Sequence, residues 1–257
     1  MGDQLMGDTR MIRALLGTAG LLAAATAFAQ DGADAARDPK KTEVWTPVPA
    51  VVATPPGKAP SDAIVLFDGK DVSAWEAEQG GRVPWKVADG AMTVVPGSKG
   101  IRTRQRFCDI QLHVEWRTPT ETKGFDGQNR GNSGIFLQEL YELQVLDSYH
   151  NPTYANGQAG SIYKQAMPLV NASRAPGQWQ AYDIIWKGPR FSPGGGLLSP
   201  ARITVLHNGV LVQDDTAVAG RTEYIGPPSY SPHGCAPLYL QEHDSRVSYR
   251  NIWVREL

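Results

Sequence analysis

Residues 201–213 read Ala-Arg-Ile-Thr-Val-Leu-His-Asn-Gly-Val-Leu-Val-Gln, which is two β-branched runs joined by Asn208-Gly209. An Asn-Gly pair accepts the positive φ angles of a type I′ turn, the turn that connects adjacent antiparallel strands through two residues. We therefore expect Ala201–His207 and Val210–Gln213 to form a β-hairpin.

Short apolar runs of the same kind, separated by Gly, Asn, Asp and Pro, continue along the chain from Ile64. Their alternation of apolar and polar residues indicates strands, and no long window shows a convincing helical period. Many short strands with turns between them predict an all-β fold, a two-sheet antiparallel jelly-roll sandwich with one core over residues 61–257. We expect residues 188–200 to be a loop insertion. The other expected strands are Ile64–Phe67, Trp85–Val87, Ala91–Val95, Ile110–Arg117, Gly134–Gln138, Tyr141–Leu146, Gln178–Lys187, Leu238–His243 and Val247–Glu256.

The N-terminal residues 1–29 have the pattern of a secretory signal peptide. Arg10 and Arg13 precede the apolar and small-residue run Leu15–Phe28, and a small-residue cleavage site ends at Ala29. The run is too short and too rich in alanine for a transmembrane span, so we expect no stable membrane insertion. Cleavage after Ala29 would leave a periplasmic or secreted protein.

Residues 30–60 form a separate region, polar at first and then rich in proline. Proline fixes φ and removes backbone donors, so a dense run of it neither joins a sheet nor continues a helix. We expect an extended arm here.

Composition limits the function classes. The formal net charge is −1, so no basic excess points to nucleic acid. The two cysteines, Cys108 and Cys235, would meet an oxidising compartment after export, where either a disulfide or two buried thiols is compatible with the sequence.

Side chains on one face of a strand recur every second residue, which lets polar residues be sorted by face. Three expected strands then each offer a polar pair on one sheet face: Glu142 with Gln144, Gln241 with His243, and Gln180 with Tyr182. Amides, a carboxylate and an imidazole suit a polyol ligand, and a carboxylate with a histidine can supply a general base and acid. The alternative is a solvated outer face without function, since antiparallel strands are commonly half polar.

Nearby residues extend this candidate site. Asp147 would join the Glu142 face only if a bulge inserted one residue. Asn132 and Ser133 stand at a strand entrance, where they either cap a ligand or close a turn. The long Gly/Asn-rich loop 151–163, which ends at Tyr163, is of the kind that carries binding residues. No zinc-ligand spacing and no phosphate-binding glycine loop is present.

Several stretches together resemble the bacterial 3-keto-disaccharide hydrolase domain family. The resemblance runs in order over 61–257, and no single motif is decisive. The stretches are Leu66-Phe-Asp-Gly-Lys-Asp-Val-Ser-Ala-Trp75, Trp85-Lys-Val-Ala-Asp-Gly90, Gly131-Asn-Ser-Gly-Ile-Phe136, Tyr141-Glu-Leu-Gln-Val-Leu-Asp147, Gly160-Ser-Ile-Tyr163, Gly177-Gln-Trp-Gln-Ala-Tyr-Asp183, Leu240-Gln-Glu-His243 and Tyr249-Arg-Asn-Ile-Trp253.

The resemblance implies a concanavalin-A-like lectin/glucanase fold whose concave sheet carries the site, and activity on glycosides oxidised to a ketone at C3. A glycoside 3-oxidoreductase that makes the ketone would be a candidate functional partner, although the sequence itself does not identify one. The strand order is similar to that of laminarinase-type glucanases, whose Glu-x-Asp-x-x-Glu strand corresponds to Glu142, Gln144 and Asp147. Because a retaining glycosidase needs two suitably spaced carboxyl groups, Gln144 argues against that mechanism.

A ketone at C3 acidifies the C2 proton, which opens an elimination route followed by hydration. In our hypothesis Glu142 and His243 share the base and acid roles in either order, and Asp147 orients His243 or completes the pair. The further binding residues would be Asn132, Ser133, Gln144, Tyr163, Gln180 and Gln241. No cofactor is evident, although folds of this type can hold a structural calcium. The competing interpretations are a lectin-like binding protein on the same fold and a conventional glucanase.

Overall fold

The hairpin expected at Asn208-Gly209 forms in the computed structural model, which describes residues 37–257. Strand β12 (Arg202–His207) pairs antiparallel with β13 (Val210–Ala217). The turn residues adopt φ angles of 54° at Asn208 and 81° at Gly209, as this turn requires. The Asn208 side chain also accepts a hydrogen bond from the backbone of Ala181 at 3.0 Å, which ties the turn to the neighbouring strand.

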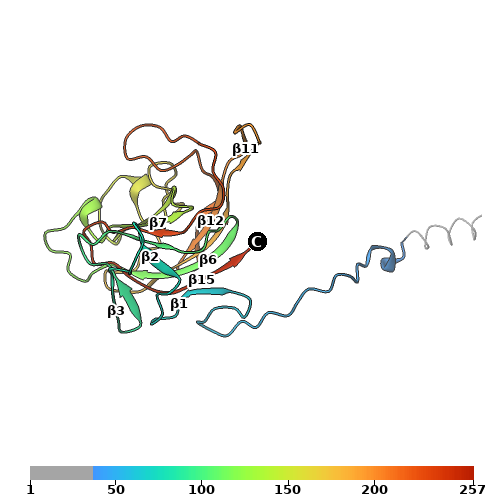
Figure 1. The fold of residues 1–257 in the computed structure, drawn as a ribbon, viewed down its shortest axis with the longest axis horizontal. Coiled ribbons are helices and arrows are strands. Elements are labelled where there is room, and N and C mark those ends of the chain that lie inside the picture. The colour runs from blue at the N-terminus through green and yellow to red at the C-terminus, as the bar shows by residue number, and fades with distance from the viewer. Residues whose placement is uncertain (1–36) are drawn as a thin grey trace, which may run out of the picture. The chain divides into compact units, whose positions relative to one another are not determined.

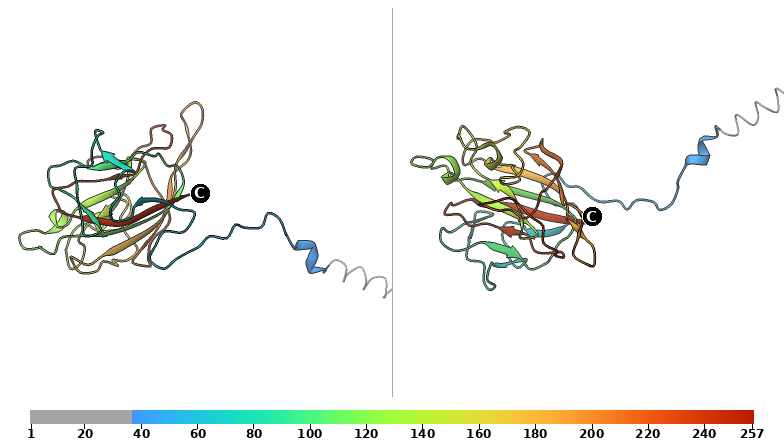
Figure 2. Two further views of the ribbon diagram at one scale, coloured as in Figure 1. Left: turned by 60° about the horizontal axis from the view of Figure 1, so that its bottom comes forward. Right: turned by 90° about the horizontal axis from the view of Figure 1, so that it is seen from above.

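Apart from a separate two-stranded hairpin, the strands form two antiparallel sheets that stack face to face (Figures 1 and 2). The eight-stranded sheet has the order β13-β12-β9-β6-β15-β4-β3, with β1 paired to β15, and the five-stranded sheet has the order β2-β5-β14-β7-β8. In chain order the remaining strands are β1 (Ile64–Phe67), β2 (Trp75–Ala77), β3 (Lys86–Ala88), β4 (Ala91–Thr93), β5 (Ile101–Thr103), β6 (Ile110–Arg117), β7 (Ser133–Leu137), β8 (Tyr141–Val145), β9 (Gln180–Lys187), β10 (Arg190–Phe191), β11 (Leu197–Ser199), β14 (Tyr239–Leu240) and β15 (Ser248–Glu256).

Alternation along the strands builds the core between the sheets. In β6, Leu112, Val114 and Trp116 are buried, whereas the residues between them are partly exposed. Leu143 and Val145 of β8 are buried in the same core, which spans both sheets. The all-β, two-sheet sandwich predicted from the sequence is therefore confirmed. Cys108 and Cys235 are joined in a disulfide, which resolves the alternative left open by the sequence.

The structure differs from the expected strands mainly at the edges. β2 and β5 were not expected, and each is only three residues long, too short for a visible alternation. The predicted loop 188–200 contains the small hairpin β10–β11. The expected strand Leu238–His243 is a strand only over β14 (Tyr239–Leu240), and residues 242–243 leave the sheet.

Besides strands, the described residues contain only three short 3-10 helices: η1 (Pro39–Thr42), η2 (Gly127–Asn129) and η3 (Ala155–Gly157). The chain divides into two units at Val51/Val52. The described part of the first unit, residues 37–51, is exposed and has no strand. The predicted signal peptide lies outside the described residues. Within residues 37–257 no helix is long and apolar enough to span a membrane.

Candidate active site

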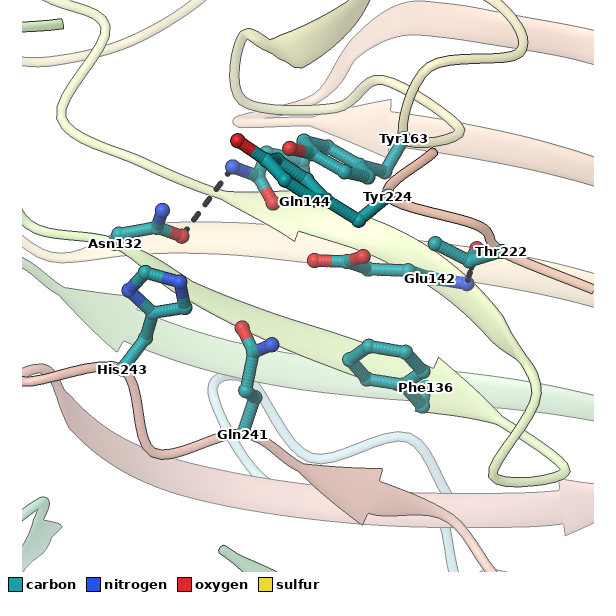
Figure 3. Close-up of a pocket in the computed structure, with 9 residues that line it drawn as sticks. All are labelled: Asn132, Phe136, Glu142, Gln144, Tyr163, Thr222, Tyr224, Gln241 and His243. Carbon is teal, nitrogen blue, oxygen red and sulfur yellow. Dashed lines mark hydrogen bonds between the residues drawn. The ribbon is translucent and has the colours of Figure 1, made fainter. Parts of the chain in front are cut away.

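A cavity of about 280 Å³ opens over the outer face of the five-stranded sheet, where β7 and β8 run side by side (Figure 3). Six of the residues singled out in the sequence line it: Asn132, Glu142, Gln144, Tyr163, Gln241 and His243. Three further residues line it that the sequence did not single out: Phe136, Thr222 and Tyr224.

Glu142 is the buried acid of the cavity. It lies on β8 opposite Phe136 of β7, and only 5% of it is exposed. Its backbone N–H donates to Thr222 Oγ1 at 2.9 Å, but no hydrogen bond reaches its carboxyl group from residues 37–257. Burial without such partners raises the pKa of Glu142 to about 8. The group therefore titrates in the range where acid–base catalysis operates.

Amide side chains form the neighbouring wall. Gln144 donates from Nε2 to Gln128 Oε1 at 3.1 Å and to Asn132 Oδ1 at 3.3 Å, while Asn132 Nδ2 donates to the Gln128 backbone oxygen at 2.8 Å. These contacts leave Gln144 Oε1 buried without a partner, and Gln241 Oε1 is in the same state. Buried polar atoms rarely stay unpaired, so two free acceptors in one cavity fit a ligand that carries hydroxyl donors.

Gln241 and His243 enter from the segment that follows β14. Figure 3 shows the Glu142 carboxyl, the Gln241 amide and the His243 ring facing one central space, with His243 and Asn132 at one end and Phe136 and Thr222 at the other. β14 ends at Leu240, and the backbone N–H of Gln241 makes a last hydrogen bond to the Gly134 oxygen of β7 at 2.9 Å before the chain turns away.

Two aromatic rings cover the space, and a lysine joins them. Lys164 Nζ donates to the Tyr224 backbone oxygen at 2.7 Å and lies 4.1 Å from the centre of the Tyr224 ring. It also lies 5.7 Å from the ring centre of Tyr163. Tyr224 is 71% exposed and lies in a loop. Because the loop has no strand pattern, the only sequence signal for Tyr224 is that it is an aromatic residue in a stretch rich in Gly and Pro.

Three predicted site residues lie elsewhere. Ser133 is buried behind the cavity, where its hydroxyl donates to the Gln241 backbone oxygen at 2.6 Å and so holds that residue in place. Asp147 follows the end of β8, and its Oδ2 pairs with Arg130 Nε at 2.8 Å, with no contact to His243. The bulge that would have brought Asp147 into the cavity does not form.

Gln180 was placed on the wrong sheet. It lies on β9 of the eight-stranded sheet, facing the core, and its amide bonds Arg174 and Asn208. Tyr182 faces the core beside it and donates to the Gln144 backbone oxygen at 2.9 Å. Alternation gives the face of a strand but not its sheet, which explains the error.

Among residues 37–257 no group of three or more His, Cys, Asp or Glu side chains is arranged to hold a metal ion. The described residues therefore give no ligand set for the structural calcium that folds of this type can hold. The cavity itself combines one carboxyl, one imidazole, three amides and a hydroxylated aromatic cover. This set can bind a polyol and move protons on it.

No curated protein sequence matches the chain. A crystal structure of a candidate glycosyl hydrolase from Parabacteroides distasonis is 51% identical, with a TM-score of 0.83 over 86% of this chain and 97% of that one. A second candidate glycosyl hydrolase from that organism is 20% identical, with a TM-score of 0.55 over 76% of this chain and 94% of that one, and shares the fold. Residues 62–255 match the 3-keto-alpha-glucoside-1,2-lyase-like domain, and the chain therefore belongs to that family.

Proposed function

We propose that the cavity cleaves 3-keto glucosides by elimination across C1 and C2, followed by hydration. The observation that carries the proposal is the buried Glu142 carboxyl, whose pKa is raised to about 8 inside a cavity otherwise lined by neutral groups and His243. A desolvated carboxylate with a pKa near the working pH is a strong base for a carbon-bound proton. The resemblance to glycosyl hydrolases and the family description support the same substrate class.

The C3 ketone acidifies the proton on C2, Glu142 removes that proton, and its electrons form an enolate on the C3 oxygen. The enolate collapses to a C1=C2 double bond while the C1–O bond breaks, and the leaving oxygen takes a proton from His243. Water then adds across C1=C2 to give the free 3-keto sugar, so the net change is hydrolysis.

The amides have separate tasks in this scheme. The Gln241 amide has no hydrogen bond to the described residues, so its N–H groups are free to stabilise the enolate oxygen. The free Oε1 atoms of Gln144 and Gln241 accept sugar hydroxyls. Asn132 is held by Gln144 and Gln128 and completes the wall. Tyr163 and Tyr224 cover the ring and keep water away from the enolate.

The test is to incubate the protein with a 3-keto disaccharide and with its unoxidised parent in D₂O. We expect cleavage of the ketone only, with deuterium at C2 of the product. Binding of both sugars without cleavage would instead favour a lectin, and release of reducing sugar from an unoxidised glucan would favour a conventional glucanase.

The two roles can be separated with a leaving group that needs no proton. A 4-nitrophenyl 3-keto glucoside should restore turnover to His243→Ala but not to Glu142→Gln. The reverse result would exchange the roles of base and acid.

We also propose that the mature protein acts in the periplasm or outside the cell, on ketones made by a glycoside 3-oxidoreductase. The disulfide between Cys108 and Cys235 supports an oxidising compartment. Fractionation of a strain that expresses the full chain, followed by N-terminal sequencing of the mature protein, would test export and cleavage after Ala29.

A further inference from the structure

A second cavity lies next to the first. It has a volume of about 350 Å³, against about 280 Å³ for the first, so the two cavities are of similar size. Neither the reaction nor the residues discussed above use it. Its walls come from loop residues, among them Pro96, Pro119, Glu121, Phe125, Asp244 and Arg246.

The two cavities share two stretches of chain. Asn132 lines the first cavity and Gly131 the second, while His243 lines the first and Asp244 the second. Since consecutive α-carbons are about 3.8 Å apart, the linings of the two cavities come close together at the end of the first that holds Asn132 and His243. Figure 3 shows these two side chains at that end.

Gln128 connects a wall of the first cavity to a wall of the second through hydrogen bonds and its place in the chain. Its Oε1 and backbone oxygen accept from Gln144 and Asn132 in the first cavity. The same residue sits in η2, three positions after Phe125 of the second cavity, and its Nε2 donates to Thr153 Oγ1 and to the Gly157 backbone oxygen at 2.9 Å. The loop that carries Phe125 is therefore anchored on the residues that bind substrate.

A second support comes from Glu242. Its Oε1 accepts from the backbone N–H of Gly97 at 3.1 Å and from that of Asp244 at 2.7 Å. The carboxylate thus holds the Pro96 turn against the segment that carries His243. Both walls of the second cavity are fixed in place by hydrogen bonds to residues that do not line it.

The chemistry of the second cavity fits a sugar ring. Phe125 is 50% exposed and, with Pro96 and Pro119, offers an apolar surface of the kind that packs on the C–H face of a pyranose. Glu121, Asp244 and Arg246 add hydrogen-bonding groups of both charges around it.

We propose that this second cavity binds the leaving sugar of a disaccharide substrate, which extends from C1 of the ketone ring past His243. The inference rests on the proposed function for the direction of the substrate, and it adds where the two rings lie: the oxidised ring over Glu142 and the intact ring against Phe125. His243, at the junction of the two cavities, then stands where the leaving oxygen must be protonated.

The test compares Phe125→Ala with the unchanged protein on two substrates, a series of 3-keto disaccharides and methyl 3-keto-α-glucoside. We expect kcat/KM for the best disaccharide to fall roughly three- to tenfold, while that for the methyl glycoside stays unchanged. Trp45→Ala, an exposed aromatic outside both cavities, is the control and should alter neither. Equal loss on both substrates, or no loss on either, would overturn the inference.

Binding of unoxidised sugars separates this inference from the proposed reaction. By titration calorimetry, the unchanged protein should bind an α-linked glucose disaccharide more tightly than methyl α-glucoside, and Phe125→Ala should remove the difference. If that holds but no ketone is cleaved, the proposed reaction fails and the disaccharide site stands. Equal affinity of the unchanged protein for both sugars would contradict the site itself.

Discussion

The Glu142 carboxyl occupies the space that a side chain at residue 134 would fill. A Cβ atom added to Gly134 would lie 2.7 Å from Glu142 Oε1 and 2.8 Å from Cε2 of Phe136. Gly134 is on β7 and Glu142 on the adjacent β8, so the missing side chain on one strand makes room for the buried acid on the other. The position of the Glu142 carboxyl therefore depends on the absence of a side chain at Gly134. No hydrogen bond from residues 37–257 holds this carboxyl group.

Gly134→Ala should displace the carboxyl and lower activity while leaving the fold intact. Both atoms in the way are side-chain ends that can move, and a displacement of about 1 Å at a reacting group can lower the rate roughly 100-fold. Steady-state kinetics on a 3-keto disaccharide would measure the loss. Gly194→Ala, where an added Cβ meets nothing within 4 Å, is the matched control. Unchanged kcat in Gly134→Ala would mean that the carboxyl position is not critical.

Glu142→Gln should lower kcat roughly 100- to 10,000-fold, because the amide cannot accept the C2 proton. In the unchanged protein the rate should rise with pH up to about 8, where Glu142 becomes ionised. A pH–rate profile that is flat between 6 and 9 would contradict the assignment of Glu142 as the base.

The same substitution should stabilise the protein in alkaline solution. The pKa of Glu142 is raised from 4.5 to about 8 on folding, so the folded state binds the extra proton and stability falls as pH rises between those values. At pH 9 Glu142→Gln should gain on the order of 3 to 5 kcal/mol in free energy of unfolding, and almost nothing at pH 4. Urea unfolding at both pH values would measure this, and an equal gain at each would argue against ionisation as the cause.

Lys164→Met should raise KM more than it lowers kcat, because it loosens the aromatic cover without touching the reacting groups. The methionine keeps the aliphatic stem but loses the hydrogen bond to the Tyr224 backbone and the contact with its ring. We expect KM to rise roughly three- to tenfold. Lys86→Met, at an exposed position on β3, is the control. A fall in kcat alone would place Lys164 in the chemistry instead.

The central strands could be predicted because both periodicity and length were visible in them. β6 and β12 follow their alternation closely, and Glu142 and Gln144 lie on the face that alternation assigned. Two-residue and three-residue strands such as β14 and β2 are defined by their partners, so their own residues carry little information.

The candidate site could be predicted less completely, for a related reason. Period-two alternation does not say which sheet a strand joins, so Gln180 was grouped with Glu142 although it lies on the other sheet. Thr222 and Tyr224 reach the cavity from a loop, where position depends on tertiary contacts such as the Thr222–Glu142 hydrogen bond. The spacing of Asp147 from Glu142 suggested that it would reach the site, but its ion pair with Arg130 holds it elsewhere.

Removal of the disulfide should destabilise the domain without altering the cavity. Cys108 and Cys235 are 127 residues apart, and a bridge over so long a loop restricts the unfolded chain strongly. Replacing both with serine should lower the free energy of unfolding by roughly 3 to 5 kcal/mol. Urea unfolding with and without reductant would check this, since reductant should destabilise only the unchanged protein. Equal midpoints for the two proteins without reductant would refute the prediction.

On the outer face of the eight-stranded sheet, His113 forms an ion-pair network remote from the cavity. Its Nδ1 lies 2.7 Å from Asp183 Oδ1 and its Nε2 lies 3.8 Å from Glu115 Oε1, while its ring stacks on Trp253. Burial on its own would lower the pKa of His113, but the hydrogen bond to Asp183 and the nearby charge of Glu115 outweigh it and raise the pKa to about 9.

His113→Gln should therefore destabilise the protein in a pH-dependent way. The folded-state pKa exceeds the ordinary value of 6.5, so the stabilisation is complete below pH 6.5 and disappears as pH rises through about 9. We expect a loss of about 3 kcal/mol at pH 6 that shrinks toward pH 10. Chemical unfolding across this range would measure it, with His150→Gln, at an exposed histidine, as the control. A loss that stays constant with pH would show that the imidazole contributes through packing on Trp253, not through its charge.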